Sequence, residues 1–239
     1  MKYIYGPVPS RRLGLSLGLS LTPHKTCNLD CIYCQLGPTA SLSTEIKEYV
    51  PVKDIFEELQ AWFRNNPEQA KELKFVTFSG CGEPTLNAGI GELIVLIKKA
   101  FSVPVCVITN ATTLSSPEVR KALLAADVVV PSLDAADTAT FEKVNRPHAS
   151  VRLEAIIDGI AAFRKEYRGR IWLEVMIVKG VNDDLAHAHR LKEIVERLAP
   201  DRIQLNSPVR STAEKDVRAA DPKRLEKIKE LFGDKAEIV

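Results

Sequence analysis

The chain has 239 residues, of which 45% are hydrophobic and 27% are charged, so it can bury a sizeable core and is neither collagen-like nor largely disordered. Its 33 basic and 31 acidic residues give a net charge of +2, too small for a protein that holds nucleic acid by overall charge. The apolar runs are far shorter than the roughly 18 residues that span a bilayer, so we expect no membrane anchor.

Six strand-like apolar runs alternate with amphipathic helical segments. The strands are expected at 15–21, 74–78, 105–109, 127–132, 171–178 and 202–206. The helices are expected at 54–65, 90–99, 117–125, 153–167, 186–198 and 222–232. This alternation predicts an α/β fold in which helices connect the strands of a parallel sheet.

The number of units favours an open (β/α)6 partial barrel, because six units are too few for a closed eight-unit barrel. An open doubly wound sheet fits the same pattern. We expect one domain over residues 1–239, with a lead-in segment at 1–13, the barrel at 14–232 and a tail at 233–239.

Chemistry in parallel α/β folds lies beyond the carboxyl ends of the strands. The segments that follow the expected strands are polar, small or metal-binding: Cys27 to Cys34, Ser79 to Pro84, Asn110, Asp134, Lys179-Gly180 and Asn206 to Arg210. Glu174 alternates with Val175 along its strand, so its carboxylate is expected inside the barrel. There it would contact a ligand or form an internal salt bridge.

The five cysteines are Cys27, Cys31, Cys34, Cys81 and Cys106. Three lie within eight residues, and the odd count favours metal ligation in a reducing compartment, so we expect a cytoplasmic protein. The C-x3-C-x2-C spacing lets three thiolates hold a 4Fe–4S cluster and leaves one iron open. A structural zinc module formed with His24 is the alternative from a different class. Cys106 is expected to be a packed core thiol, whereas Cys81 is either a packed thiol or one that faces the substrate.

The segment from Cys27 to Cys34, with Tyr33 just before the third cysteine, resembles the signature of the radical S-adenosylmethionine (SAM) superfamily. The segment from Phe78 to Leu86 resembles the Gly-Glu-Pro element of that superfamily. Further segments resemble its wyosine-synthase-like branch: 5–12, 109–110, 132–134, 145–148 and 204–210.

The resemblance implies that a 4Fe–4S cluster reductively cleaves SAM to a 5'-deoxyadenosyl radical, which abstracts hydrogen from a substrate. It implies cluster ligation by Cys27, Cys31 and Cys34. It also implies SAM contacts from the Ser79-Gly80 and Gly82-Glu83 segments, with Gly82 and Glu83 receiving the amino group. The other implied contacts are Tyr33 beside the adenine, Asn110 and Ser132 at the ribose and carboxylate, and Glu174 at SAM or the substrate.

The resemblance is incomplete, since wyosine synthases carry a second cluster bound by upstream cysteines and no cysteine precedes Cys27. Activation of a glycyl-radical enzyme and small-molecule radical chemistry are therefore alternatives. The resemblance also implies an electron donor such as flavodoxin or ferredoxin. Because a six-unit barrel lacks two units of wall, we expect a macromolecular substrate, RNA or protein, with Arg11, Arg12 and Arg210 near its entry.

Overall fold

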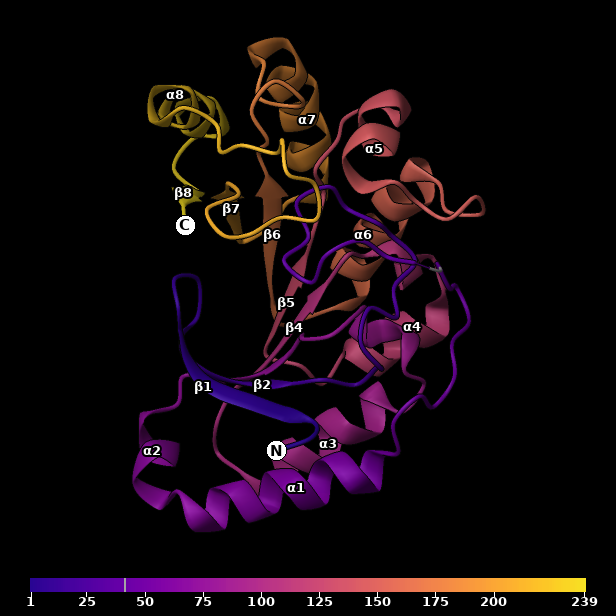
Figure 1. Cartoon of the computed structure of the whole chain (residues 1–239), viewed down its shortest axis with the longest axis vertical. Helices are drawn as coiled ribbons and strands as arrows, with labels where there is room; N and C mark the ends of the chain where they lie inside the picture. The colour runs from indigo at the N-terminus through magenta and orange to yellow at the C-terminus, as the bar shows by residue number, and fades with distance from the viewer. Residues whose placement is uncertain (41) are drawn as a thin grey trace.

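A computed structural model describes residues 1–40 and 42–239 and contains one eight-stranded sheet whose strands follow one another in chain order (Figure 1). Its strands are β1 (Ile4–Ser10), β2 (Gly14–Leu19), β3 (Phe75–Phe78), β4 (Val105–Thr109), β5 (Val128–Pro131), β6 (Arg170–Met176), β7 (Arg202–Asn206) and β8 (Ala236–Ile238). Strand β1 pairs with β2 in the antiparallel sense, and all other neighbours are parallel. The open α/β sheet confirms the expected fold class.

The six expected strands are β2 to β7, and the structure adds β1 and β8 at the two ends of the sheet. The segments expected as a lead-in (1–13) and a tail (233–239) contribute these two strands to the same sheet. Strand β1 was missed because Pro7 and Pro9 lack backbone N–H groups and interrupt the apolar pattern. Strand β8 is only three residues long.

Helices connect the parallel strands. They are α1 (Val52–Asn65), α2 (Pro67–Glu72), α3 (Ile90–Ala100), α4 (Pro117–Leu123), α5 (Thr138–Asn145), α6 (Leu153–Glu166), α7 (Leu185–Leu198) and α8 (Pro222–Phe232). Two short 3-10 turns, η1 (Pro84–Leu86) and η2 (Thr112–Ser115), follow β3 and β4. The six expected helices are confirmed within a few residues, while the shorter α2 and α5 were not predicted. Among the described residues, no helix has the length and apolar character needed to cross a membrane.

The helices pack on the outer face of the sheet, where buried aliphatic side chains form the main core. In strand β2 the sequence determines what each of its two faces packs against. Its residues Leu17 and Leu19 are buried in the main core, and a Cβ atom at Gly18 would lie 2.0 Å from the Tyr5 ring. The alternation of Leu with Gly and Ser therefore gives β2 one apolar face and one face that an aromatic ring can cover.

A second core cluster lies on the other face of the sheet, inside the barrel. Its members are Leu13, Phe75, Cys106, Val128, Val130 and Trp172. Leu13 belongs to the tip of the β1–β2 hairpin, so the hairpin fills the barrel interior from one end. Cys106 is fully buried there, as predicted.

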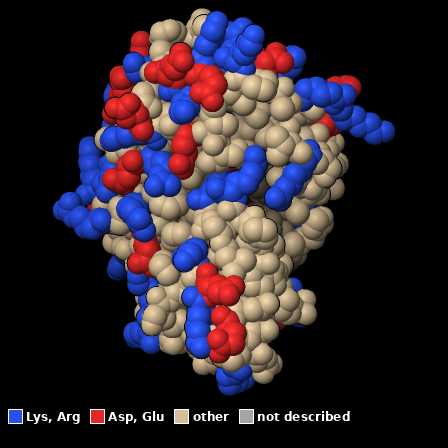
Figure 2. Space-filling view, turned by 90° about the vertical axis from the view of Figure 1, so that its left-hand side faces the viewer, with Lys and Arg blue, Asp and Glu red and all other residues tan. Residues whose placement is uncertain are grey.

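The same hairpin tip reaches the opposite end of the sheet. Arg11 donates hydrogen bonds to the Val239 carbonyl (2.8 Å) and to Asn206 Oδ1 (3.2 Å), and Arg12 forms an ion pair with Glu174. Figure 2 shows the face on this side of the molecule, where Lys and Arg side chains flank a central hollow. The side of the barrel that lacks two units is therefore spanned by side chains of the hairpin.

Candidate active site

The three clustered cysteines lie in the loop that follows β2, at the carboxyl edge of the sheet. The Cys34 N–H donates to the Cys31 carbonyl (3.0 Å), which makes a tight turn between these two residues. Burial raises the pKa of the Cys27 thiol to about 11 and that of Cys31 further. An unliganded thiol at either position is therefore protonated near neutral pH, and metal binding has to displace that proton.

The loop after β3 packs directly on the cysteine loop. The Lys25 N–H donates to the Cys81 carbonyl (2.5 Å), and the Glu83 N–H donates to the Thr26 carbonyl (2.9 Å). At Gly82 a Cβ atom would lie 2.1 Å from the Thr26 carbonyl oxygen, so only glycine permits this approach. Gly80 has a φ of +103°, a conformation that also favours glycine. The Gly-rich sequence thus fixes how the two loops meet.

Glu83 is buried, and its carboxylate accepts four hydrogen bonds. Oε1 accepts from the Thr85 N–H (3.1 Å), the Thr85 hydroxyl (2.6 Å) and the Thr109 hydroxyl (2.7 Å), while Oε2 accepts from the Asn110 N–H (2.8 Å). Burial raises the pKa of Glu83, and these donors oppose the rise. The carboxylate therefore connects the β3 loop to the end of β4, and a ligand ammonium would have to share Oε2.

Tyr33 belongs to a buried polar network centred on Asp134. Its hydroxyl donates to Asp134 Oδ2 (2.5 Å), Asn145 Nδ2 donates to the same oxygen (2.8 Å), and the Met176 N–H donates to Oδ1 (2.9 Å). Burial raises the pKa of Asp134 to about 6 despite these donors. Asp134 thus fixes the orientation of the aromatic ring that precedes Cys34.

A cavity of about 20 Å³ adjoins this network. Nine residues line it: Leu29, Tyr33, Asn110, Ser132, Leu133, Asp134, Phe141, Asn145 and Ile156. Three expected SAM-contact residues, Tyr33, Asn110 and Ser132, therefore meet at one place beside the cysteine loop. Sequence reasoning assigned no role to Asp134 or Asn145, although both fall in segments that carried the family resemblance.

Ser79 and Glu174, two other expected SAM-contact residues, do not line this cavity. The Ser79 hydroxyl bonds to the Tyr5 hydroxyl from the antiparallel edge strand. Glu174 forms the ion pair with Arg12 and accepts a hydrogen bond from Asn206 Nδ2 (3.0 Å). The internal salt bridge, one of the two expectations for Glu174, is thus what the structure contains. Arg11 and Arg12, expected near the substrate entry, are engaged in joining the two ends of the sheet.

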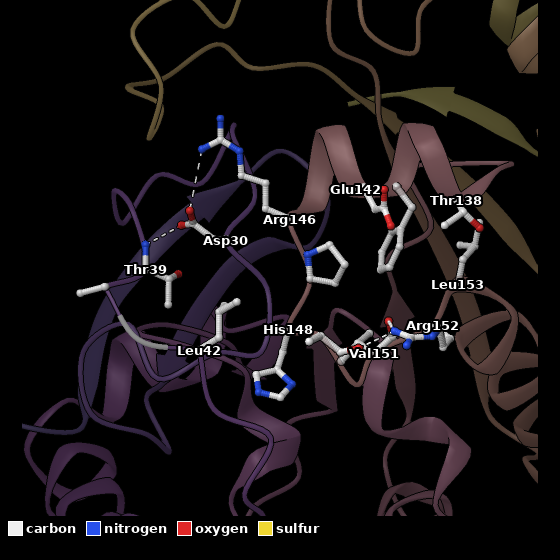
Figure 3. A pocket seen from close by; sticks show the side chains of 14 residues that line it. Asp30, Thr39, Leu42, Thr138, Glu142, Arg146, His148, Val151, Arg152 and Leu153 are labelled. Atoms are coloured by element: carbon white, nitrogen blue, oxygen red, sulfur yellow. Dashed lines mark hydrogen bonds and ion pairs between the residues drawn. The ribbon is translucent and has the colours of Figure 1, made fainter.

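A larger groove of about 890 Å³ lies on the outer side of the cysteine loop. Figure 3 shows Asp30, Thr39 and Leu42 on one side, and Glu142 and Leu153 on the other. The two walls are joined where the Asp30 N–H donates to the Asn145 carbonyl (3.0 Å) and the His148 N–H to the Asn28 carbonyl (2.9 Å). The groove therefore borders the cysteine loop at Asp30.

The zinc alternative would need a fourth ligand beside the three cysteines. A tetrahedral zinc site needs four ligands around one point, whereas within residues 1–40 and 42–239 no three His, Cys, Asp or Glu side chains are arranged around a single-ion position. His24 is also exposed. In a 4Fe–4S cluster each cysteine sulfur binds a different iron, so the sulfurs lie further apart than they would around a single zinc ion. Three cysteines without a fourth protein ligand fit such a cluster with one open iron.

Comparison with known proteins shows the family of the chain. The sequence model of the Radical SAM superfamily matches residues 21–199. A UPF0026 protein of Methanocaldococcus jannaschii is 32% identical over 234 residues, which cover 98% of this chain and 72% of that protein. A Brachyspira hyodysenteriae protein named GTPase Obg is 39% identical over 231 residues, 97% of this chain. The chain spans only 33% of the length of that relative, and it has no G-x4-G-K-[ST] phosphate-binding motif.

Two solved structures share the fold. A radical SAM methyltransferase from Sphaerobacter thermophilus superposes with a TM-score of 0.73 at 16% identity, covering 94% of this chain and 65% of that one. TYW1 with a lysine-pyruvate adduct superposes with a TM-score of 0.66 at 20% identity, covering 91% and 72%. The expected cofactor pair, a 4Fe–4S cluster and SAM, is that of the matched family. The chain belongs to the radical SAM superfamily of enzymes.

Proposed function

We propose that this chain reductively cleaves SAM at a 4Fe–4S cluster held by Cys27, Cys31 and Cys34, and that the radical acts on a macromolecular substrate. The observation that carries the proposal is the position of the three cysteines beside the cavity lined by Tyr33 and Asn110. When bound, the cluster and SAM supply the electron transfer and the 5'-deoxyadenosyl radical.

The residues of the chain would bind and orient the cofactors. The open iron would take the amino and carboxylate groups of SAM, next to the loop that carries Gly80 and Gly82. Tyr33, Asn110 and Ser132, which line the small cavity, would contact one side of the adenosine part. Glu83 would act as a positioning residue, because its four hydrogen bonds hold the β3 loop against the end of β4. Ser79 would contribute its backbone, since its hydroxyl bonds to Tyr5.

RNA is the macromolecule that the surface favours. The basic side chains around the hollow in Figure 2 provide positive charge for phosphate groups on a chain of nearly neutral overall charge. Arg210 is exposed on the loop after β7, where its only described side-chain contact is with Gln35 (3.4 Å). A Prochlorococcus marinus relative, 27% identical over 187 residues that cover 74% of this chain and 51% of that protein, is named a probable dual-specificity RNA methyltransferase. Protein activation and small-molecule chemistry are the competing functions.

The outer groove is suited to the approach of an electron donor such as flavodoxin or ferredoxin. A donor bound there would lie against the backbone that carries Cys31. Such a donor and the thiol-bound cluster both favour a reducing compartment, so we propose the cytoplasm.

The proposal is tested with anaerobically purified protein, a chemical reductant and SAM. We expect about four irons per chain and slow formation of 5'-deoxyadenosine without substrate. Separate cell fractions of RNA, protein and metabolites are then added, and stimulation by RNA supports the proposal. Stimulation by the metabolite fraction alone would defeat the macromolecular substrate. A colourless protein with stoichiometric zinc would defeat the enzyme function altogether.

A further inference from the structure

Each of the three cysteine sulfurs lies within hydrogen-bonding distance of a side-chain nitrogen. The three contacts join Lys25 Nζ to Cys34 Sγ (3.0 Å), Asn110 Nδ2 to Cys27 Sγ (3.5 Å) and Asn145 Nδ2 to Cys31 Sγ (3.4 Å). The donors come from three separate segments: the cysteine loop itself, the end of β4 and the end of α5. Every cysteine sulfur therefore has its own side-chain donor.

Lys25 is held in place by its backbone. Its φ is +60°, in the left-handed region, which costs a residue with a side chain roughly 1–2 kcal/mol. The hydrogen bond from its N–H to the Cys81 carbonyl (2.5 Å) fixes this conformation. Glycine would adopt it without strain. The ammonium group contacts Cys34, nine residues further along the chain.

The amide of Asn110 has a defined orientation. Its Oδ1 accepts hydrogen bonds from the Thr112 N–H (3.1 Å) and the Thr112 hydroxyl (2.7 Å). Its Nδ2 donates to Asn28 Oδ1 (2.8 Å), which leaves the second N–H for Cys27. Because oxygen and nitrogen of an amide are assigned from such partners, the nitrogen must face the sulfur.

The amide of Asn145 is fixed in a different way. Asn145 is buried, and its Nδ2 donates to Asp134 Oδ2 (2.8 Å). Asp134 is itself held by the Met176 N–H (2.9 Å). The carboxylate cannot donate to the amide when it is ionised, so it selects the orientation in which the Asn145 nitrogen faces Cys31 Sγ and the Tyr33 hydroxyl, each 3.4 Å away. Asp134 thereby acts on the cysteine through Asn145.

We propose that Lys25, Asn110 and Asn145 set the reduction potential of the cluster, and that Lys25 contributes most. This inference rests on the proposed function. One electron from the donor adds one negative charge to the cluster, and no proton moves. Hydrogen bonds to the sulfurs and a nearby cation both stabilise the more negative, reduced form. The three residues therefore make the cluster easier to reduce, whereas the cysteines alone hold it.

The test is a redox titration of the reconstituted protein without SAM, followed by electron paramagnetic resonance of the reduced cluster. For Lys25→Met we expect at least a tenfold lower ratio of reduced to oxidised cluster at a fixed solution potential, equal to 59 mV for one electron. Lys25→Arg keeps the cation and should titrate close to the wild type. Asn110→Leu and Asn145→Leu should shift the ratio in the same direction by smaller factors.

Lys53→Met is the matched control, because Lys53 is 80% exposed on α1 and pairs only with Glu57 (3.8 Å) among the contacts described. It should leave the potential unchanged. Equal potentials for Lys25→Met and the wild type would overturn the inference. Loss of iron from all the Lys25 and Asn variants would overturn it too, because these residues would then hold the cluster rather than tune it. A wild type without a cluster would instead refute the proposed function.

Discussion

The ion pair between Arg12 and Glu174 links the tip of the hairpin to β6, toward the other end of the sheet, and its removal should destabilise the fold. The Glu174 side chain is 9% exposed, and that of Arg12 is 23% exposed. In Arg12→Met the buried carboxylate keeps one described hydrogen bond, from Asn206 Nδ2 (3.0 Å). An unpaired charge then remains in a region that water reaches poorly.

Removing one partner of a buried ion pair costs roughly 3–5 kcal/mol. Arg12 is partly exposed and Asn206 remains in contact, so we expect a smaller cost of about 2–3 kcal/mol. A change of 1 kcal/mol shifts the melting temperature of a chain of this size by roughly 2–4 °C. The melting temperature should therefore fall by about 4–12 °C.

The assay is thermal unfolding of the cluster-free protein, followed by circular dichroism. The double variant Arg12→Met/Glu174→Met replaces both charges by apolar groups and should recover much of the loss, because such replacements are often nearly neutral. Arg210→Met is the control, since Arg210 is exposed and contacts only Gln35 among the described side chains. Equal melting temperatures for Arg12→Met and Arg210→Met would refute the reasoning.

The cysteine loop and the network behind it yield three more measurable outcomes. Cys31→Ala should lose the cluster because two thiolates cannot replace three, while Cys106→Ala should keep full iron content by elemental analysis. Gly82→Ala forces a Cβ atom against the Thr26 carbonyl and should cost roughly 1–3 kcal/mol in urea unfolding and lower the iron content; unchanged iron would contradict the close-approach argument. Because burial raises the pKa of Asp134 to about 6, its contribution to stability is present below pH 4 and is lost as the pH rises through 6. Asp134→Asn should remove this decline of about 3 kcal/mol, and identical pH profiles would contradict it.

Much of the fold could be predicted because each parallel strand has a recognisable hydrophobic pattern in its own sequence. In β2 the alternation of Leu with Gly and Ser indicates a strand whose two faces differ. In β5 the continuous valines indicate a strand that is buried on both faces. The edges could not be predicted from such patterns. In β1 the residues Pro7 and Pro9 are typical of a turn, and only pairing with β2 makes the segment a strand.

The sequence predicts which loops form the site, but not which side chains contact one another there. The cysteine spacing is local, so it can be recognised in the sequence. The bond between Tyr33 and Asp134 joins residues 101 positions apart, and no local pattern reports it. Glu83 was expected to receive a ligand, and the four donors that surround it come together only when β3 and β4 are adjacent.

The two outer strands of the sheet bear on how the protein avoids aggregation. An open sheet exposes unpaired backbone groups that can recruit a strand from another molecule. In β1, Pro7 and Pro9 offer no N–H to such a strand. At the other end β8 is three residues long, and Arg11 already bonds to the carbonyl of Val239 just beyond it. Substitution of both prolines by valine should therefore increase self-association while leaving the parallel strands and the cysteine loop in place.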